Sequence, residues 1–424
     1  MNRDMMNLLN VHKLDLESKI KQSTNLDRVL FSFFIFFCLL PYLNVLRIPT
    51  DGQPNALVLS IIIFSIWIRN YKYHRYFLFI SLFIILSFIL GSISGRQLNF
   101  NFFRSLIAYL SLFFITIISY VSFKLGYVLK WKWFKIFVYV NIGVSLLQRL
   151  LGFNFIEFLF FRFATSDTRG VTGLTPEPTF NASIGIFCLS IYLLNYYDKA
   201  RNYILVLIFF WIVFLAQSST IVLMSFPIVL LYFTFKYFTK VILPLLVVGI
   251  IAFTVFNKKN DEKVQSRLFT VLSVVVANPS TLLILDGSVN ERISHIVIPI
   301  YASLKDFMIP HGTNMTVVNN EVTSLKKTTN FFYFYSPGAG IERIMSGWAM
   351  MFYEVGFFAF VLFFYLLFLI FFKLDNFGLE FLGAILFIIV LFTAVTVNTA
   401  IVPYILGNII YRSSLKRNGS EKIY

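Results

Sequence analysis

Two long polar segments interrupt a chain that is otherwise rich in apolar residues, and the first of them covers 152–179. It contains Arg169-Gly170 and, shortly before a long apolar run, Glu177 between two prolines. Glycine lets the backbone turn sharply and approach a ligand, and the prolines favour an extended conformation at Glu177. A guanidinium offers a bidentate fork to phosphate and a carboxylate can accept a proton, so Arg169 and Glu177 are candidates for phosphate binding and acid–base chemistry. The alternative is that Arg169 reaches to lipid headgroups and pairs with Glu177.

The second polar segment, 257–344, contains the sequence of a helix start. Ser288-Val289-Asn290-Glu291 has the form of a capping box, so we predict a helix from there to about Phe307, with a kink near Pro299. Such a helix would lie along the outer membrane surface with its apolar face down. The apolar positions that follow helical spacing are Ile293, Ile296, Val297, Ile300, Leu304 and Phe307.

Arg292 and His295 lie three residues apart on this predicted helix, so their side chains point the same way. A cation beside an imidazole could hold a pyrophosphate and move a proton. The alternative is two interfacial side chains without a ligand. The general base is therefore either Glu177 or His295, and the sequence does not choose between them.

Three further residues are candidates for supporting roles. Arg343 lies just before the apolar run 345–372, and Glu354 lies inside that run. An intramembrane carboxylate is costly and is a functional candidate for that reason, although an ion pair with an arginine would also explain it. Tyr301 adds an aromatic ring of the kind that stacks on sugars, and tyrosine is equally common as an interface anchor.

The elements that must position these residues are membrane helices. The 424 residues are 58% hydrophobic and only 13% charged, whereas soluble domains carry roughly a quarter charged residues. This composition excludes an ordinary soluble domain, a disordered chain and a disulfide scaffold. Apolar runs suited to a hydrocarbon core of about 30 Å predict about twelve transmembrane helices in an all-α polytopic protein. They lie at about 28–46, 54–69, 75–95, 103–123, 132–151, 180–197, 202–217, 218–236, 240–256, 345–372, 378–395 and 397–411.

The net charge of +16 predicts the orientation of these helices. With loops assigned alternately to two sides, one side receives more than half of the 36 Lys and Arg residues, all in tails and short loops. Short cytoplasmic loops are enriched in these residues. We therefore predict a cytoplasmic N-terminal tail (1–27), transmembrane helices one to nine (28–256), a large periplasmic loop (257–344), three further helices (345–411) and a cytoplasmic tail (412–424).

The same charge distribution makes a nucleic-acid partner unnecessary. The sequence contains no zinc-ligand spacing, Walker loop, GxSxG elbow or dinucleotide fingerprint, and its outer loops lack an Asp-x-Asp metal motif. We expect no metal and no cofactor. Transferase chemistry in this chain should therefore use a substrate that already carries a good leaving group.

Over roughly 140–411 the chain resembles the O-antigen polymerase and ligase superfamily, and the Wzy-type polymerases in particular. The order of four motifs and their predicted topology carry the resemblance. The motifs are Arg169-Gly170-Val171-Thr172-Gly173-Leu174 before Pro176-Glu177-Pro178; Gln217-Ser218-Ser219-Thr220 between two apolar runs; Arg292 with Pro310-His311-Gly312 downstream; and Tyr353-Glu354-Val355-Gly356-Phe357-Phe358, followed by a closing hairpin with Pro403.

The resemblance implies a C-type glycosyltransferase architecture without a divalent metal, in the bacterial inner membrane. It implies transfer of glycan from undecaprenyl pyrophosphate, on the periplasmic side, to the end of another lipid-linked repeat unit. By the same resemblance Arg169 and Arg292 would grip the pyrophosphate, and partners would include the lipid bilayer, a chain-length regulator and a flippase. Ligases of the superfamily carry a His-Asn pair where this chain has Met345-Ser346, which argues against a ligase.

A flippase or other transporter is the alternative from a different class. It predicts charged residues in the middle of spans and short loops, whereas this chain has few such charges and two long outer loops. A structural scaffold without catalytic activity is a third hypothesis. It predicts that every periplasmic arginine can be replaced without effect.

Overall fold

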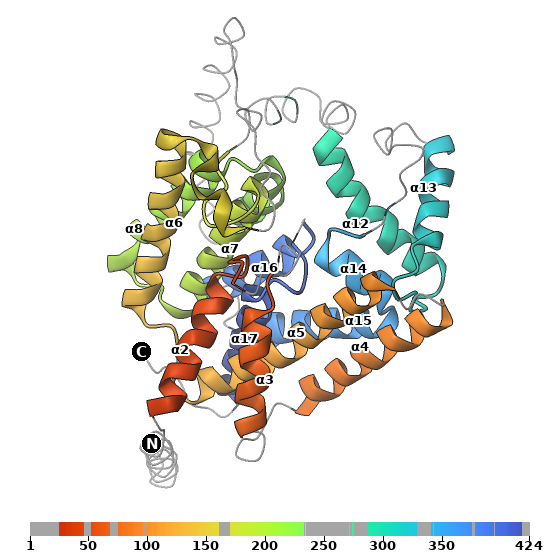
Figure 1. Ribbon diagram of the computed structural model, residues 1–424, viewed down its shortest axis with the longest axis horizontal. Coiled ribbons are helices and arrows are strands. Elements are labelled where there is room, and N and C mark those ends of the chain that lie inside the picture. The colour runs from red at the N-terminus through yellow and green to blue at the C-terminus, as the bar shows by residue number, and fades with distance from the viewer. Residues whose placement is uncertain are drawn as a thin grey trace, which may run out of the picture.

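The computed structural model describes an all-helical protein (Figure 1). The residues described are 25–45, 52–67, 75–95, 99–160, 170–232, 287–328, 343–374, 378–393 and 395–417, together with Thr234, Val271, Val274 and Ile341, and these contain no β-strand. The α-helices are α2 (Asn25–Leu39), α3 (Asn55–Trp67), α4 (Arg75–Ser94), α5 (Phe100–Lys124), α6 (Trp131–Leu151), α7 (Pro178–Asn195), α8 (Tyr203–Phe210), α12 (Gly287–Lys305), α13 (Thr316–Thr328), α14 (Gly347–Glu354), α15 (Phe357–Lys373), α16 (Leu379–Val390) and α17 (Ile401–Arg417). Helix Ser219–Tyr232, two short 3-10 helices, η1 (Phe153–Leu159) and η2 (Lys199–Arg201), and a π-helix, η3 (Trp211–Ala216), complete this part of the chain.

Within the described ranges, four helices, α4, α5, α6 and α7, are long and apolar enough to cross a membrane. Shorter apolar helices cover five more of the predicted runs, at Asn55–Ile66, Tyr203–Ala216, Ser219–Tyr232, Phe357–Lys373 and Leu379–Val390. The predicted class, an α-helical membrane protein, agrees with these helices. The count of about twelve spans stays a prediction, and the run predicted at 240–256 lies outside the described residues.

The outside of the molecule is strongly apolar. Along α4, Phe79, Leu82, Phe83 and Leu86 are all exposed. An exposed apolar surface on this scale is unsuited to water, and lipid would cover it without cost.

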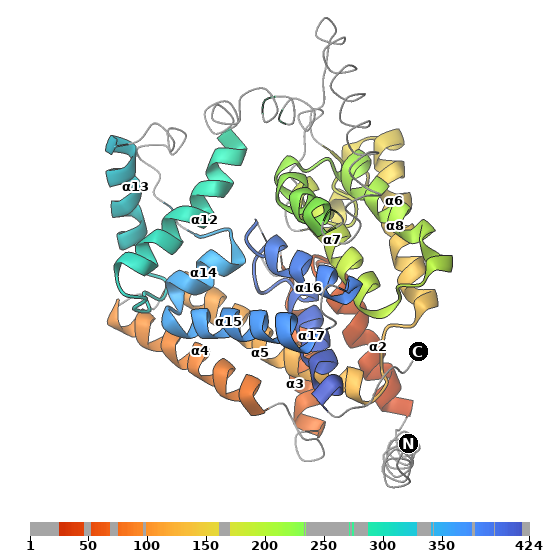
Figure 2. The same cartoon turned by 180° about the vertical axis from the view of Figure 1, so that it is seen from behind.

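Large rings fill the contacts between helices distant in sequence. α5 packs against α17, where Phe123 and Tyr404 have ring centroids 5.4 Å apart. α7 packs against α16, where Phe187 and Phe387 lie 6.1 Å apart. Figures 1 and 2 show α4, α5 and α15 running alongside one another, with α6 and α8 at one end of the molecule and α12 and α13 at the other.

The run predicted as one span at 345–372 is instead two helices, α14 and α15, with a break at Val355-Gly356. Gly356 has φ +68°, a conformation that a side chain disfavours, and a Cβ there would lie 2.2 Å from the Met308 carbonyl oxygen. The Phe357 amide donates to the same carbonyl at 2.9 Å. The segment between α12 and α13 therefore packs into the break.

The helix predicted from the capping box is α12, which begins at Gly287 and continues through Pro299 to Lys305. Its predicted apolar face is turned outward, with Val297 and Leu304 exposed. The opposite face, which includes His295, Ile298 and Ser303, is buried. This buried face packs against α14, where the Ser303 hydroxyl donates to the Phe352 carbonyl at 2.7 Å.

Candidate functional site

The loop that leads into α7 is fixed to the turn after η3. The Val171 amide donates to the Leu215 carbonyl at 2.9 Å. Only glycine fits at position 170, because a Cβ there would lie 2.1 Å from the carbonyl oxygen of Ala216. The sharp turn predicted next to Arg169 is thus a close approach of two backbones, and it brings the first and second motifs together.

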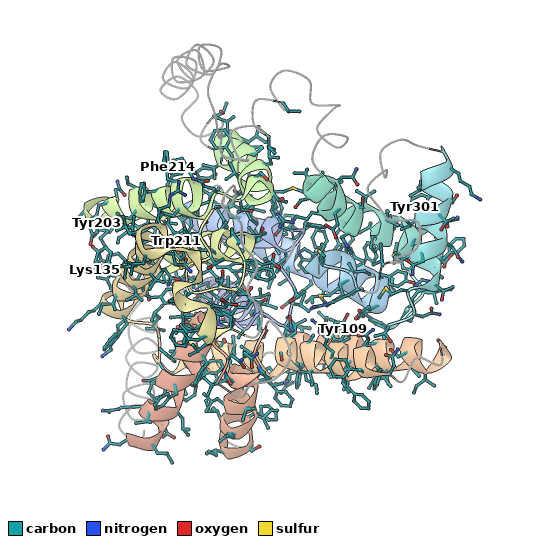
Figure 3. All side chains as sticks on the ribbon, turned by 45° about the horizontal axis from the view of Figure 1, so that its top comes forward. Tyr109, Lys135, Tyr203, Trp211, Phe214 and Tyr301 are labelled. Atoms are coloured by element: carbon teal, nitrogen blue, oxygen red, sulfur yellow. The ribbon has the colours of Figure 1, made fainter. Side chains whose placement is uncertain are left out.

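Two buried amide side chains hold this loop in shape. Gln148 of α6 donates to the Thr172 hydroxyl at 2.8 Å and accepts from the Gly173 amide at 2.7 Å. Asn181 of α7 donates to the Val171 carbonyl and accepts from the Trp211 indole, each at 2.9 Å. Trp211 is labelled among the side chains of this region in Figure 3. All four hydrogen bonds are buried, and each one pairs a polar group of these amides. The loop therefore enters α7 along a defined path.

The second motif forms a tight turn between η3 and helix Ser219–Tyr232. Gln217 adopts the left-handed conformation, with φ 47° and ψ 35°, and ends the π-helix. The next helix begins two residues later, with Ser218 and Thr220 both buried. Thr220 therefore lies in a first helical turn, beside the loop that precedes α7.

Arg292, on α12, connects that helix to both of these helix starts. Its Nη1 donates to the Thr220 hydroxyl at 2.8 Å, and its Nη2 donates to the Thr179 hydroxyl at 2.6 Å. Thr179 lies in the first turn of α7, directly after Pro178. One guanidinium thus joins three segments that are far apart in sequence.

The chemistry of this arrangement suits an anion. The positive end of a helix dipole lies at each helix N-terminus, and both α7 and helix Ser219–Tyr232 begin here. A guanidinium adds a permanent positive charge with five N–H donors in a rigid fork. A threonine hydroxyl that accepts from the fork keeps its own proton to donate. Phosphate oxygens are the acceptors that such a set of donors binds best.

The two candidate bases occupy different surroundings. Glu177 precedes α7, two residues before Thr179, and is partly exposed. His295 is buried on α12, where its Nδ1 accepts from the Met345 amide at 3.4 Å. Burial lowers the pKa of His295 to about 4, because the charged imidazolium is poorly solvated there. Arg292 and His295 lie on neighbouring turns of α12 but have different partners. Arg292 contacts α7 and helix Ser219–Tyr232, whereas His295 contacts the segment before α14.

Arg169 is adjacent to Gly170 but lies outside the described residues. Tyr301 is exposed on α12, with the Lys305 ammonium 6.0 Å from its ring centroid. It takes no part in the contacts around Arg292 that the structure describes.

Glu354, at the end of α14, accepts from two α5 side chains. The Tyr109 hydroxyl donates to its carboxylate at 2.8 Å and the Ser105 hydroxyl at 3.3 Å. Arg343 interacts electrostatically with the same carboxylate. An arginine therefore contributes to the electrostatic surroundings of Glu354, as the alternative explanation expected, together with two hydroxyl donors that the sequence did not suggest.

The third and fourth motifs also meet. The amides of His311 and Gly312 donate to the carbonyls of Tyr353 and Glu354, at 3.2 and 3.0 Å. The His311 ring stacks on Tyr353 with centroids 4.5 Å apart, and its Nε2 lies 3.0 Å from the Asp306 carboxylate. These contacts fix the turn after α12 to the break between α14 and α15.

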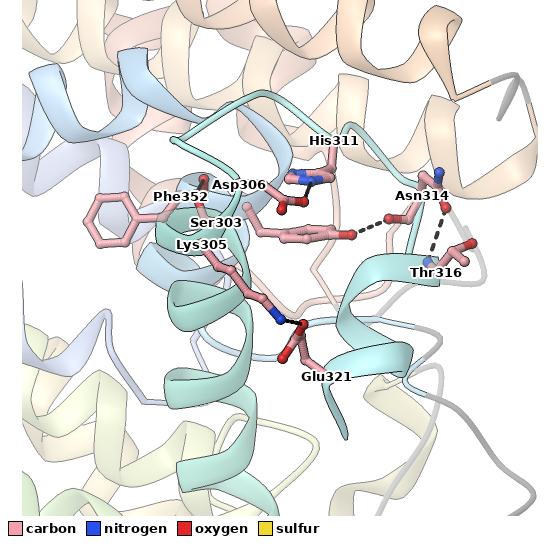
Figure 4. A network of polar contacts seen from close by, with 9 residues as sticks. Ser303, Lys305, Asp306, His311, Asn314, Thr316, Glu321 and Phe352 are labelled. Carbon is pink, nitrogen blue, oxygen red and sulfur yellow. Dashed lines mark hydrogen bonds and ion pairs between the residues drawn. The ribbon is translucent and has the colours of Figure 1, made fainter. Parts of the chain in front are cut away.

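A polar network extends these contacts toward α13 (Figure 4). Tyr353 donates to the Asn314 carbonyl, and Lys305 pairs with Glu321. The hydrogen bond to Glu321 raises the pKa of the Lys305 ammonium. The turn at Asn314 is thereby held against α14, and α13 is held against α12.

Several site residues were not predicted from the sequence. Thr220 belongs to the second motif and Thr179 directly follows the first, but their role as acceptors for Arg292 depends on packing. Gln148 and Asn181 lie inside apolar runs, and such amides in a predicted span are the signal that could have marked them.

Among the residues that the structure describes, no group of three or more His, Cys, Asp or Glu side chains could hold a metal ion. Comparisons with protein-family models, curated proteins and solved structures found no match to this chain.

Proposed function

We propose that this protein is a polymerase of lipid-linked oligosaccharide repeat units, which acts on the periplasmic face of the bacterial inner membrane. It would transfer glycan from undecaprenyl pyrophosphate to the end of another lipid-linked unit of an O-antigen or similar surface polysaccharide. The observation that carries the proposal is the contact of Arg292 with Thr220 of the second motif and with Thr179, which directly follows the first motif. The proposal includes both termini in the cytoplasm.

In this reaction a hydroxyl oxygen of the acceptor sugar attacks the anomeric carbon of the donor glycan. The bond from that carbon to the pyrophosphate oxygen breaks, and the electron pair leaves with undecaprenyl pyrophosphate. Arg292, together with Arg169, would neutralise the charge that develops on this leaving group. No redox partner is needed, because the activated donor supplies the driving force.

The proton of the attacking hydroxyl must pass to a base. We favour Glu177 for this role, because it is partly exposed and lies two residues from the Arg292 contact at Thr179. His295 is a weaker candidate, because its burial lowers its pKa to about 4 and its Nδ1 faces the Met345 amide. Replacement of Glu177 by Gln should therefore slow polymerisation far more than replacement of His295 by Gln.

The deciding experiment uses purified protein and a defined undecaprenyl-pyrophosphate repeat unit. We expect a ladder of products on a gel, unchanged by EDTA. Absence of a ladder with intact, monodisperse protein would refute the proposal, and loss of the ladder in EDTA would refute the metal-independent mechanism.

A deletion strain distinguishes this function from the two alternatives. Loss of a polymerase leaves single repeat units on the surface lipid, whereas loss of a flippase leaves lipid-linked units on the cytoplasmic side. Loss of a ligase leaves polymer on undecaprenyl pyrophosphate. Either of the last two results would overturn the polymerase proposal.

A further inference from the structure

The contacts of Arg292 come from rigid parts of the structure. Thr179 lies in the first turn of α7, where Pro178 restricts the backbone and the Ser183 hydroxyl bonds the Thr179 carbonyl at 2.8 Å. Thr220 lies in the first turn of helix Ser219–Tyr232, after the left-handed Gln217. The backbone of neither threonine can move far without moving its helix.

The two hydroxyls are also well protected from solvent. Thr179 is 5% exposed and Thr220 is 3% exposed, so water competes poorly for their bonds to the guanidinium. Arg292 by contrast extends from α12, which belongs to the periplasmic segment. A long side chain of this kind has many rotamers, and two acceptors on separate helices select one orientation of its planar group.

We infer that Thr179 and Thr220 are positioning residues that hold the Arg292 guanidinium in the plane needed to bind pyrophosphate. This inference rests on the proposed function, and it adds two residues that act on the substrate through Arg292. The Thr220 bond orients Nη1 and the Thr179 bond orients Nη2, so both are needed to define the plane.

The test compares two pairs of substitutions in the full-length protein. Thr179→Val with Thr220→Val keeps the side-chain shape and removes both acceptors, whereas Thr179→Ser with Thr220→Ser keeps both hydroxyls. Thr116→Val is the matched control, because Thr116 is buried in α5 and its hydroxyl has no partner among the described residues.

In the ladder assay we expect the double valine variant to lose about 10- to 100-fold in kcat, with a smaller change in KM. The double serine variant should recover most of this loss, and Thr116→Val should match the wild type. A valine variant that polymerises at the wild-type rate would overturn the inference while leaving the proposed function intact. Equal loss in the serine variant would also overturn it, because the effect would then follow from packing rather than from the hydroxyl.

Hydrogen exchange in α12 supplies a readout that needs no turnover. If the threonines hold Arg292, amides of residues 287–305 should exchange several-fold faster in the valine variant and at the wild-type rate in the serine variant. Unchanged exchange in the valine variant would refute the positioning role. If the wild type makes no ladder but α12 exchange responds as expected, the proposed function is wrong and the threonine–arginine contact stands.

Discussion

Replacement of Arg292 by Lys separates the charge of this residue from its geometry. Lysine keeps the positive charge but presents it as a compact point, without the planar fork that meets Thr179 and Thr220 on two different helices. The protein should still fold, since Arg292 is only partly buried. Any loss of activity then measures how much the planar guanidinium, rather than its charge, contributes to activity.

The size of the effect follows from the two hydrogen bonds. A hydrogen bond to a charged group contributes about 1.5–3 kcal/mol, and about 1.4 kcal/mol corresponds to a factor of ten in rate. Loss of one such bond in Arg292→Lys predicts a fall in kcat/KM of about 10- to 150-fold. Arg292→Ala removes both bonds and the charge, so a loss of about 10²- to 10⁴-fold should eliminate long-chain glycan.

The assay measures initial rates of ladder formation with purified variants, alongside chain length in a complemented deletion strain. Arg149→Ala is the control, because Arg149 is exposed at the end of α6, near the loop that precedes α7. We expect long chains from this control at normal membrane levels of protein. Normal polymer from Arg292→Ala would refute the phosphate-binding role, and full activity of Arg292→Lys would refute the importance of the fork. Arg169→Ala, tested in parallel, should abolish long chains if both arginines hold the pyrophosphate.

Three further predictions concern stability and the shape of the site. Gly170→Ala should abolish polymerisation and lower the melting temperature, because its Cβ has no room, whereas Gly143→Ala, with nothing within 4 Å of the new Cβ, should be neutral in both assays. Burial lowers the pKa of His295 to about 4, so the protein should be most stable above pH 6.5 and should lose up to about 3 kcal/mol as the pH falls toward 4. A pH series of thermal melts should show a smaller loss in His295→Gln. Identical pH profiles for the two proteins would contradict this role. Glu354→Ala should destabilise the protein by about 1–3 kcal/mol, because the Tyr109 hydroxyl loses its buried acceptor; an unchanged melting temperature in detergent would contradict that role.

The sequence by itself determined the class of structure and many helix boundaries. Apolar runs of about 20 residues predict helices because every backbone polar group must be satisfied within the segment in lipid. The runs predicted at 75–95, 103–123 and 132–151 correspond to α4, α5 and α6 within a few residues. The helix predicted from about Ser288 corresponds to α12, but α12 already includes Gly287, so Ser288 lies inside the helix rather than at its N-cap.

The break between α14 and α15 shows where local patterns are insufficient. The apolar run at 345–372 continues without interruption by polar residues other than Glu354 and small side chains, so hydropathy predicts one helix. The break depends on the Met308 carbonyl, which approaches Gly356 from the segment between α12 and α13. A contact between distant segments of the chain thus changed a local structure.

Which candidate residues meet depends on the packing of the helices. Arg292 and His295 are three residues apart in sequence, yet Arg292 contacts α7 and helix Ser219–Tyr232, whereas His295 contacts Met345 in the segment before α14. The partners of Arg292 are 72 and 113 residues away, and Tyr109 is 245 residues from Glu354. Spacing along a helix fixes only the direction in which a side chain leaves its own axis, while its partner depends on how helices pack. The sequence supplied Arg292 as a candidate, and packing placed Thr179 and Thr220 as the acceptors of its hydrogen bonds.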